Sequence, residues 1–101
     1  MKSLTNNQGK YRKRLYETMA ALETAAECER FLTDLCTPGE LVALTDRWRV
    51  AALLELGTPY REIYEKTGVS TATVTRIARC LGGGKGGYRL ALEKIGRNAN
   101  A

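Results

Sequence analysis

Residues 58–81 read TPYREIYEKTGVSTATVTRIARCL, and this stretch has the order of signals that a helix-turn-helix requires. Thr58 is expected to cap a first helix, with Pro59 at its first position, where the missing N–H costs nothing. Gly68 is expected to end that helix, because glycine adopts a left-handed backbone without a Cβ penalty. Ser70 is then expected to cap a second helix. The sequence therefore predicts two short helices joined by a tight turn.

The second helix of this motif has an apolar face and a polar face. Helical spacing places four apolar residues inward, and the turn adds a fifth residue that we expect to be buried: Val74, Ile77, Ala78, Leu81 and Val69.

The outward residues are short or basic, which suits the base edges of a DNA major groove. The candidate base contacts are Thr71, Ala72, Thr75, Arg76 and Arg79. The candidate phosphate contacts are Arg61, Lys66, Ser70 and Lys85. A surface pair of helices with an ordinary polar face is the alternative interpretation.

Positive charge is unevenly distributed along the 101 residues, whose net charge is +5. Residues 1–14 carry five basic side chains and no acidic one, and the C-terminal part of the chain is also basic. Residues 15–36 are acidic, with five carboxylates against one arginine. A basic face with a less basic body behind it is typical of a nucleic-acid-binding protein, so double-stranded DNA is the expected partner.

Several function classes are excluded by what the sequence lacks. It contains no apolar run of about 18 residues, which a membrane helix needs, and its start does not resemble a signal peptide, so we expect a cytoplasmic protein. The cysteines Cys28, Cys36 and Cys80 match neither a disulfide framework nor zinc-ligand spacing, and there is no histidine. We expect these thiols to be buried and reduced. No metal, no cofactor and no enzymatic activity is predicted, because no nucleophile–base pair is evident.

The periodicity predicts six helices and no strands. Residues 1–14 are expected to form a flexible basic arm and the start of a first helix, which begins at Tyr11. Residues 15–95 are expected to be one domain containing the helix-turn-helix at 58–81, and residues 96–101 a tail. Residues 82–87 are a glycine run, predicted to be a flexible joint that lets Lys85 approach phosphate.

The third predicted helix is apolar nearly all round. It follows a capping box at residues 37–40 and runs over residues 38–56, where eleven of nineteen residues are apolar. A helix of this kind must be covered on most sides, and two short preceding helices look insufficient. We therefore expect a homodimer, with a monomer that packs its first two helices over the third as the alternative.

Several segments together resemble the bacterial tryptophan repressor superfamily. They are TPGELVAL at 37–44, RWRV at 47–50, REI at 61–63 and ATVTR at 72–76. The continuation at 79–81, followed by the glycine run and Gly87-Tyr88, is similar to the YerC/YecD branch. The resemblance covers residues 15–95. It implies an all-α, six-helix, intertwined homodimer, whose two helix-turn-helix units bind DNA half-sites about one helical turn apart.

The resemblance also implies a possible ligand pocket. In the repressor, L-tryptophan is held by two arginines, a threonine and backbone carbonyls, and this chain has matching residues at Thr37, Arg47 and Arg76. It departs at Ile77, where the repressor has glycine against the indole, and at Cys80, where it has serine. A branched side chain occupies the volume that an indole ring needs. We therefore expect that tryptophan is not the effector and leave any other small-molecule effector unassigned.

If tryptophan is absent, Arg47 and Arg76 need another role. They could pair with Asp46 or Glu40, contact DNA phosphate, or hold a different small anion. Taken together, the sequence predicts a sequence-specific transcriptional regulator, most simply a repressor, that binds the DNA major groove with the helix starting near Ser70. The alternative is a dimeric helix-turn-helix adaptor that binds protein or RNA.

Overall fold

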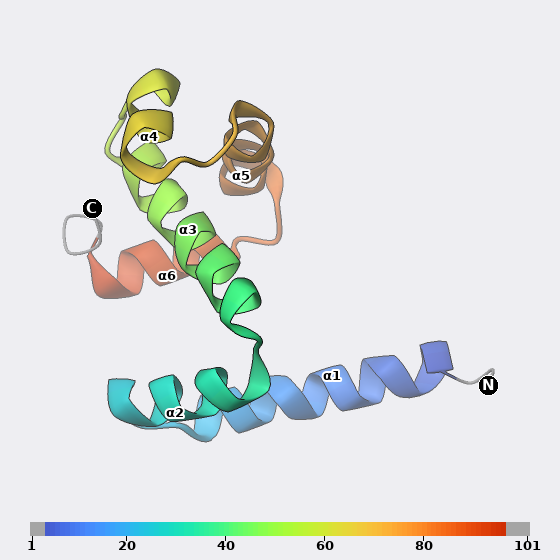
Figure 1. Ribbon diagram of the computed structural model, residues 1–101. Coiled ribbons are helices and arrows are strands. Elements are labelled where there is room, and N and C mark those ends of the chain that lie inside the picture. Colours follow the sequence, from blue (N-terminus) through green and yellow to red (C-terminus); the bar gives the residue numbers. More distant parts are fainter. Residues whose placement is uncertain (1–3, 97–101) are drawn as a thin grey trace. The chain divides into compact units, whose positions relative to one another are not determined.

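The computed structural model describes residues 4–96, and over this range the chain is all-α, with six helices and no strand (Figure 1). The helices are α1 (Leu4–Ala21), α2 (Ala25–Leu35), α3 (Pro38–Glu55), α4 (Tyr60–Thr67), α5 (Thr71–Gly83) and α6 (Gly87–Ile95). The predicted all-α class with six helices is thus confirmed. Of the predicted tail, residues 97–101 lie outside the described part, as do residues 1–3 of the predicted arm. No described helix combines the length and hydropathy that crossing a membrane would require.

The chain divides into two compact units at Pro38, and the first unit contains α1 and α2. Thr24 caps α2, since its hydroxyl accepts from the Glu27 N–H at 3.1 Å. This contact satisfies an N–H that the first helical turn cannot pair internally. The carboxylate of Glu27 in turn accepts from the N–H of Glu23, the residue before the cap, at 2.8 Å.

The predicted start of the first helix is wrong, because α1 begins at Leu4 and not at Tyr11. The segment between them is rich in asparagine, threonine and glycine, which suggested an irregular backbone. Such residues cost only about 0.5–1 kcal/mol each in a helix, and no proline interrupts them. Extending an existing helix adds one hydrogen bond per residue without a new nucleus, so the weak formers are included.

The second unit contains α3 to α6 around a small apolar core. The second half of α3 supplies four buried residues, and α4, α5 and α6 supply the rest: Val50, Ala51, Ala52, Leu53, Ile63, Val74, Ile77 and Leu92. Val69, Leu81 and Tyr88 are partly buried against this cluster. The predicted inward face of α5 is therefore confirmed, and this face fixes the helix against α3.

The first half of α3 is much more exposed than the second. Val42 is 59% exposed and Leu44 is 43% exposed, whereas the apolar residues from Val50 to Leu53 are buried. The helix is apolar on most sides along its length, so the described chain leaves part of its apolar surface uncovered. This is the pattern from which a second subunit was predicted.

Two predicted element ends are corrected by the structure. Pro59, not Thr58, is the N-cap of α4, because the Thr58 N–H donates to the carbonyl of Leu53 at 3.1 Å and so belongs to the end of α3. The segment between the last two helices is also shorter than predicted, since α5 continues to Gly83 and α6 starts at Gly87. Only three residues remain between these helices.

The predicted burial of the cysteines is wrong for two of the three. Cys28 and Cys80 are exposed and Cys36 is half-buried, and all three are free thiols. Cys28 shares a stripe with Phe31 and Leu32 on α2, but no residue of α2 is buried. Nothing in the described chain covers this stripe fully.

Candidate nucleic-acid interface

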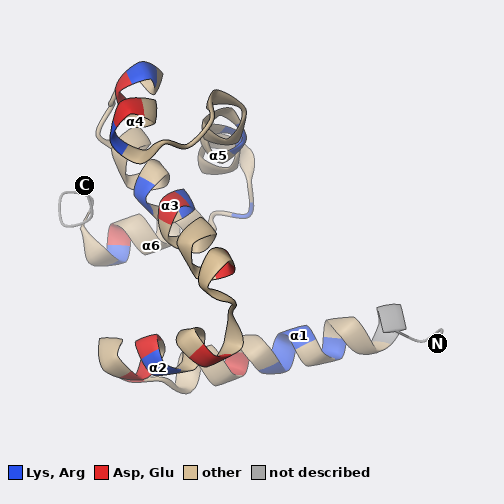
Figure 2. Cartoon of the chain, in the orientation of Figure 1, with Lys and Arg blue, Asp and Glu red and all other residues tan. Residues whose placement is uncertain are grey.

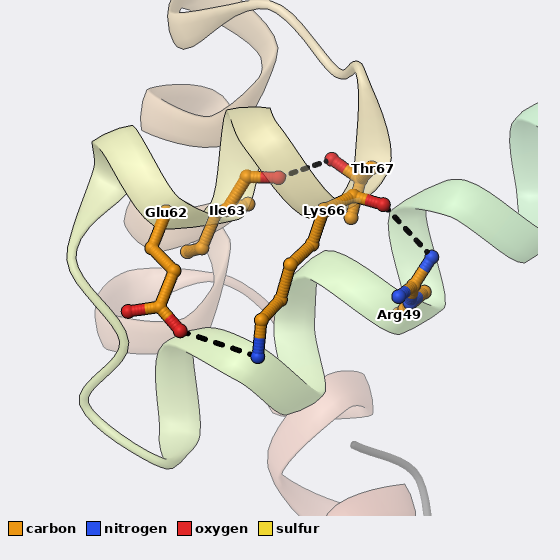
Figure 3. A network of polar contacts seen from close by, with 5 residues as sticks. All are labelled: Arg49, Glu62, Ile63, Lys66 and Thr67. Atoms are coloured by element: carbon orange, nitrogen blue, oxygen red, sulfur yellow. Dashed lines mark hydrogen bonds and ion pairs between the residues drawn. The ribbon is translucent and has the colours of Figure 1, made fainter.

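The turn between α4 and α5 is fixed by its own hydrogen bonds. Gly68 has φ +73°, the left-handed conformation predicted for it, and its N–H donates to the Tyr64 carbonyl at 2.7 Å. The Thr67 hydroxyl donates to the Ile63 carbonyl at 2.7 Å (Figure 3) and accepts from the Val69 N–H at 3.1 Å. The turn is therefore closed on both sides of the glycine.

Ser70 opens α5 as predicted. Its side-chain oxygen accepts from the Thr73 N–H at 3.3 Å, and its hydroxyl donates to the Thr73 side-chain oxygen at 3.2 Å. The Ser70 hydroxyl thus serves the first turn of α5. The predicted contact of Ser70 with phosphate stays a prediction, and the N–H groups of this first turn, which lie outside the intrahelical ladder, are the donors suited to it.

A polar contact that the sequence did not indicate joins α3 to the C-terminal end of α4. Arg49 Nη1 donates to the Lys66 carbonyl at 3.2 Å, and Lys66 Nζ pairs with Glu62 Oε2 at the same distance (Figure 3). A cation at a helix C-terminus satisfies an unpaired carbonyl and is favoured by the helix dipole. Arg49 therefore helps to hold the helix-turn-helix against α3.

The outward face of α5 is composed largely as predicted. Thr71, Ala72, Arg76 and Arg79 are exposed, and Thr75 is half-buried. The inward Val74 and Ile77 on the same helix are at most 1% exposed. The buried face fixes the helix, while its exposed face presents two hydroxyl-bearing side chains, one methyl group and two guanidinium groups.

Basic residues predominate from the turn onward. Between Gly68 and Leu92 the sequence has four basic residues and no acidic one: Arg76, Arg79, Lys85 and Arg89. On α4, by contrast, both signs occur, as Figure 2 shows. Arg61 is paired with Glu65 at 3.9 Å and its side chain is 92% exposed, whereas Lys66 is half-exposed. Lys85 is exposed on the joint after α5.

The structure also places the residues of the possible ligand pocket. Ile77 is buried in the core at 1% exposure, while Arg47, Arg76 and Cys80 are exposed. Thr37 belongs to the first compact unit, and its grouping with the other four stays a prediction. Among residues with described positions, no cluster of three or more histidine, cysteine or acidic side chains is suited to a metal ion.

Tyr88 is a residue to which the sequence assigned no role in the site. Burial raises the pKa of Tyr88 above its ordinary value of 10.0, and Cys80 raises it further, while Arg47 and Arg76 oppose the rise. Its ring stacks on Trp48, with ring centroids 6.4 Å apart. The sequence signals nearby were the glycine run, which predicted a joint, and Gly87-Tyr88 as part of the family resemblance.

The first helix, α4, ends at a left-handed glycine, and the second helix, α5, is capped by Ser70 and packs on the core through Val74 and Ile77. This arrangement defines a helix-turn-helix protein. The model of the Trp repressor protein family matches residues 10–96 of the chain. The chain belongs to the Trp repressor family.

Known proteins resemble it over most of its length. The uncharacterized protein YerC from Bacillus subtilis (strain 168) is 40% identical over 88 residues, which cover 87% of this chain and 85% of YerC. A crystal structure of a TrpR-like protein from Eubacterium eligens ATCC 27750 has a TM-score of 0.81 and is 36% identical, covering 86% of this chain and 90% of that one. A candidate Trp repressor from Staphylococcus aureus has a TM-score of 0.81 and 32% identity, covering 94% and 95%. The predicted resemblance and its YerC branch are confirmed.

Proposed function

We propose that the chain is a sequence-specific regulator of transcription that binds double-stranded DNA in the cytoplasm and acts as a repressor. In this proposal, α5 enters the major groove and its N-terminal half contacts base edges. Family membership supports a helix-turn-helix regulator of this kind. An enzymatic role has no support in the described residues.

The proposal rests mainly on the different composition of the two faces of α5. Its inner face is packed on the core through buried Val74 and Ile77, which fixes the position of the helix. Its outer face combines Thr71 and Ala72, short enough to approach base edges, with two arginines. No carboxylate lies on this helix to repel phosphate.

The candidate contacts divide into two kinds. Short side chains on α5 are assigned to bases, and the arginines of α5 to bases or backbone. The remaining basic residues and the first turn of α5 are assigned to phosphate. The proposed base contacts are Thr71, Ala72, Thr75, Arg76 and Arg79, and the proposed phosphate contacts are Arg61, Lys66, Ser70 and Lys85.

The proposal includes a homodimer. The exposed apolar residues on the first half of α3, Val42 and Leu44, and the uncovered stripe on α2 are suited to a second copy of the same chain. A dimer would present two α5 helices to two half-sites of a palindromic operator.

The proposal excludes tryptophan as the effector. Ile77 is packed in the core at the position where the resemblance places the indole, so a free ring has no volume there. Calorimetric titration with L-tryptophan is expected to give no heat of binding. Stoichiometric micromolar binding would contradict this part of the proposal and leave DNA binding intact.

Selection of bound duplexes from a random pool tests the proposed function. We expect a palindromic consensus with half-sites about one helical turn apart. The affinity for the selected duplex should exceed that for random DNA by about a thousandfold and fall as salt rises. Absence of any affinity for duplex DNA near about 50 mM salt would favour an adaptor that binds protein or RNA.

A further inference from the structure

Tyr88, the second residue of α6, joins that helix to α3 through an aromatic stack. The Tyr88 and Trp48 ring centroids are 6.4 Å apart, and the ring planes are inclined by 18°. Both side chains are half-buried against the core cluster formed by α3, α4 and α5. Aromatic pairs at this spacing stabilise a contact beyond the area that they bury. The stack and the core therefore fix the position of the Tyr88 ring.

Three of the residues that the sequence grouped as a possible ligand pocket influence the Tyr88 phenol. Burial is the main cause that raises the pKa of this phenol, Cys80 raises it too, and Arg47 on α3 and Arg76 on α5 lower it. Because such interactions weaken with distance, these three residues belong to the neighbourhood of the phenol.

The backbone leading to Tyr88 allows little variation. A Cβ added to Gly84 would lie 2.7 Å from the carbonyl oxygen of Cys80, and Gly86 has φ +81°. Both positions therefore require glycine, and the joint is a tight turn. Beyond it, Arg89 Nη1 and Glu55 Oε1 are 2.6 Å apart, an ion pair that ties α6 to α3 again. Tyr88 is thus placed by constraints on either side.

Neither Ile77 nor Tyr88 leaves its position open to a diffusible molecule. Ile77 fills its part of the core, and Tyr88 already stacks on Trp48. We propose that Tyr88 is a built-in substitute for a small aromatic ligand, a positioning residue whose ring, stacked on Trp48 and packed against the core that contains Val74 and Ile77, fixes α5 for DNA binding. This inference rests on the proposed DNA-binding function and adds its regulation, namely that DNA affinity needs no aromatic effector.

Removal and chemical replacement of the ring test the inference. Tyr88→Ala retains Cβ and lacks a phenol, so phenol is the matching probe. We expect the variant to bind the selected duplex about tenfold or more weakly, the range typical of coupled sites, and millimolar phenol to restore much of the loss. Tyr88→Phe keeps the ring and should bind nearly as the wild type does. Leu90→Ala, at a residue 55% exposed on the same helix, is the matched control and should leave affinity unchanged.

A second readout separates this inference from the proposed function. Trp48 is the only tryptophan, so its fluorescence reports on the stack without DNA. We expect Tyr88→Ala to change the Trp48 emission and phenol to reverse the change.

A wild-type chain that binds no DNA would overturn the proposed function. Unchanged DNA affinity in Tyr88→Ala, or no response to phenol in both assays, would overturn the inference alone. If Tyr88→Ala does not fold by circular dichroism, Tyr88→Leu, which retains apolar volume without a ring, replaces it in both assays.

Discussion

The guanidinium of Arg49 donates to the backbone carbonyl of Lys66 at 3.2 Å, across 17 residues of sequence. Arg49 lies on α3, and Lys66 lies in the last turn of α4, so the bond joins the helix that carries half of the buried core residues to the first helix of the motif. The side-chain ammonium group of Lys66 forms an ion pair with the carboxylate of Glu62 at 3.2 Å. One arginine thus holds the end of α4 where the turn begins.

Replacing Arg49 by alanine should reduce stability modestly. The Lys66 carbonyl would lose a charged donor at a helix C-terminus, an interaction of about 0.5–1 kcal/mol in exposed settings. Urea unfolding followed by circular dichroism measures the difference. Arg61→Ala is the control, because that side chain is 92% exposed and pairs only within α4, and it should unfold as the wild type does. Equal losses in both variants would argue against a specific role for Arg49.

Ser70 allows the capping role to be separated from DNA binding. Ser70→Ala should cost about 1 kcal/mol, because the Thr73 N–H loses its acceptor. Ser70→Asp keeps a good cap and favours the helix dipole, so stability should be retained. The added negative charge should nevertheless weaken binding to all duplex DNA. A stable Ser70→Asp protein with unaltered DNA affinity would mean that this end of α5 does not face DNA.

Base contacts and phosphate contacts predict different mutant behaviour. Thr71→Ala should weaken binding to the selected duplex by about 1–3 kcal/mol and relax the preference at one base pair, with little effect on random DNA. Lys66→Ala should weaken both and reduce the slope of log affinity against log salt by about one unit. Fluorescence anisotropy at several salt concentrations distinguishes the two. Parallel losses on both duplexes for Thr71→Ala would show that α5 does not select the sequence.

The exposed apolar half of α3 gives a test of the dimer. Val42→Glu places a charge at a side chain 59% exposed in the single chain, so a monomer should tolerate it. If that surface is covered by a second copy, the burial of an unpaired carboxylate should dissociate or unfold the protein. Arg61→Glu, at a side chain 92% exposed on α4 and outside that surface, is the control. Analytical ultracentrifugation of a stably folded wild-type monomer would contradict the dimer outright.

The Tyr88 pKa leads to a prediction at alkaline pH. Because burial, with Cys80, raises the pKa of Tyr88 in the folded protein above 10.0, the folded state holds this proton more tightly than the unfolded state. The stabilisation is complete below pH 10.0 and is lost as pH rises from there through the folded pKa. Ultraviolet titration should show a tyrosine that ionises above pH 10.0 in the folded protein. Tyr88→Phe should remove that component.

The parts of the fold that were predictable are those controlled by local chemistry. Gly68 and Ser70 were identified because a left-handed turn and an N-cap each demand a few residue types, whatever surrounds them. The inward face of α5 followed from helical spacing. The start of α1 was missed because weak helix formers indicate only a small free-energy preference, which a growing helix overrides.

The contacts that escaped prediction join residues distant in sequence. Arg49 and Lys66 are 17 residues apart, and the Glu55–Arg89 pair spans 34. Neither pair has a periodic or spacing signal, because its formation depends on how whole helices pack. The role of Tyr88 escaped prediction for the same reason, since its stacking partner Trp48 lies three helices earlier. For the candidate site, sequence therefore indicated which residues face outward on α5, but not what holds that helix in place.

On α5, Val74 and Ile77 are the two buried residues, with Leu81 partly buried against the same core, while Thr71, Ala72 and Arg76 are exposed. Changes at the outer positions therefore leave the core intact. After gene duplication, such a helix is free to drift toward a new target while its fold persists, so paralogues of this protein should differ first at those outer residues and last at the two inner ones.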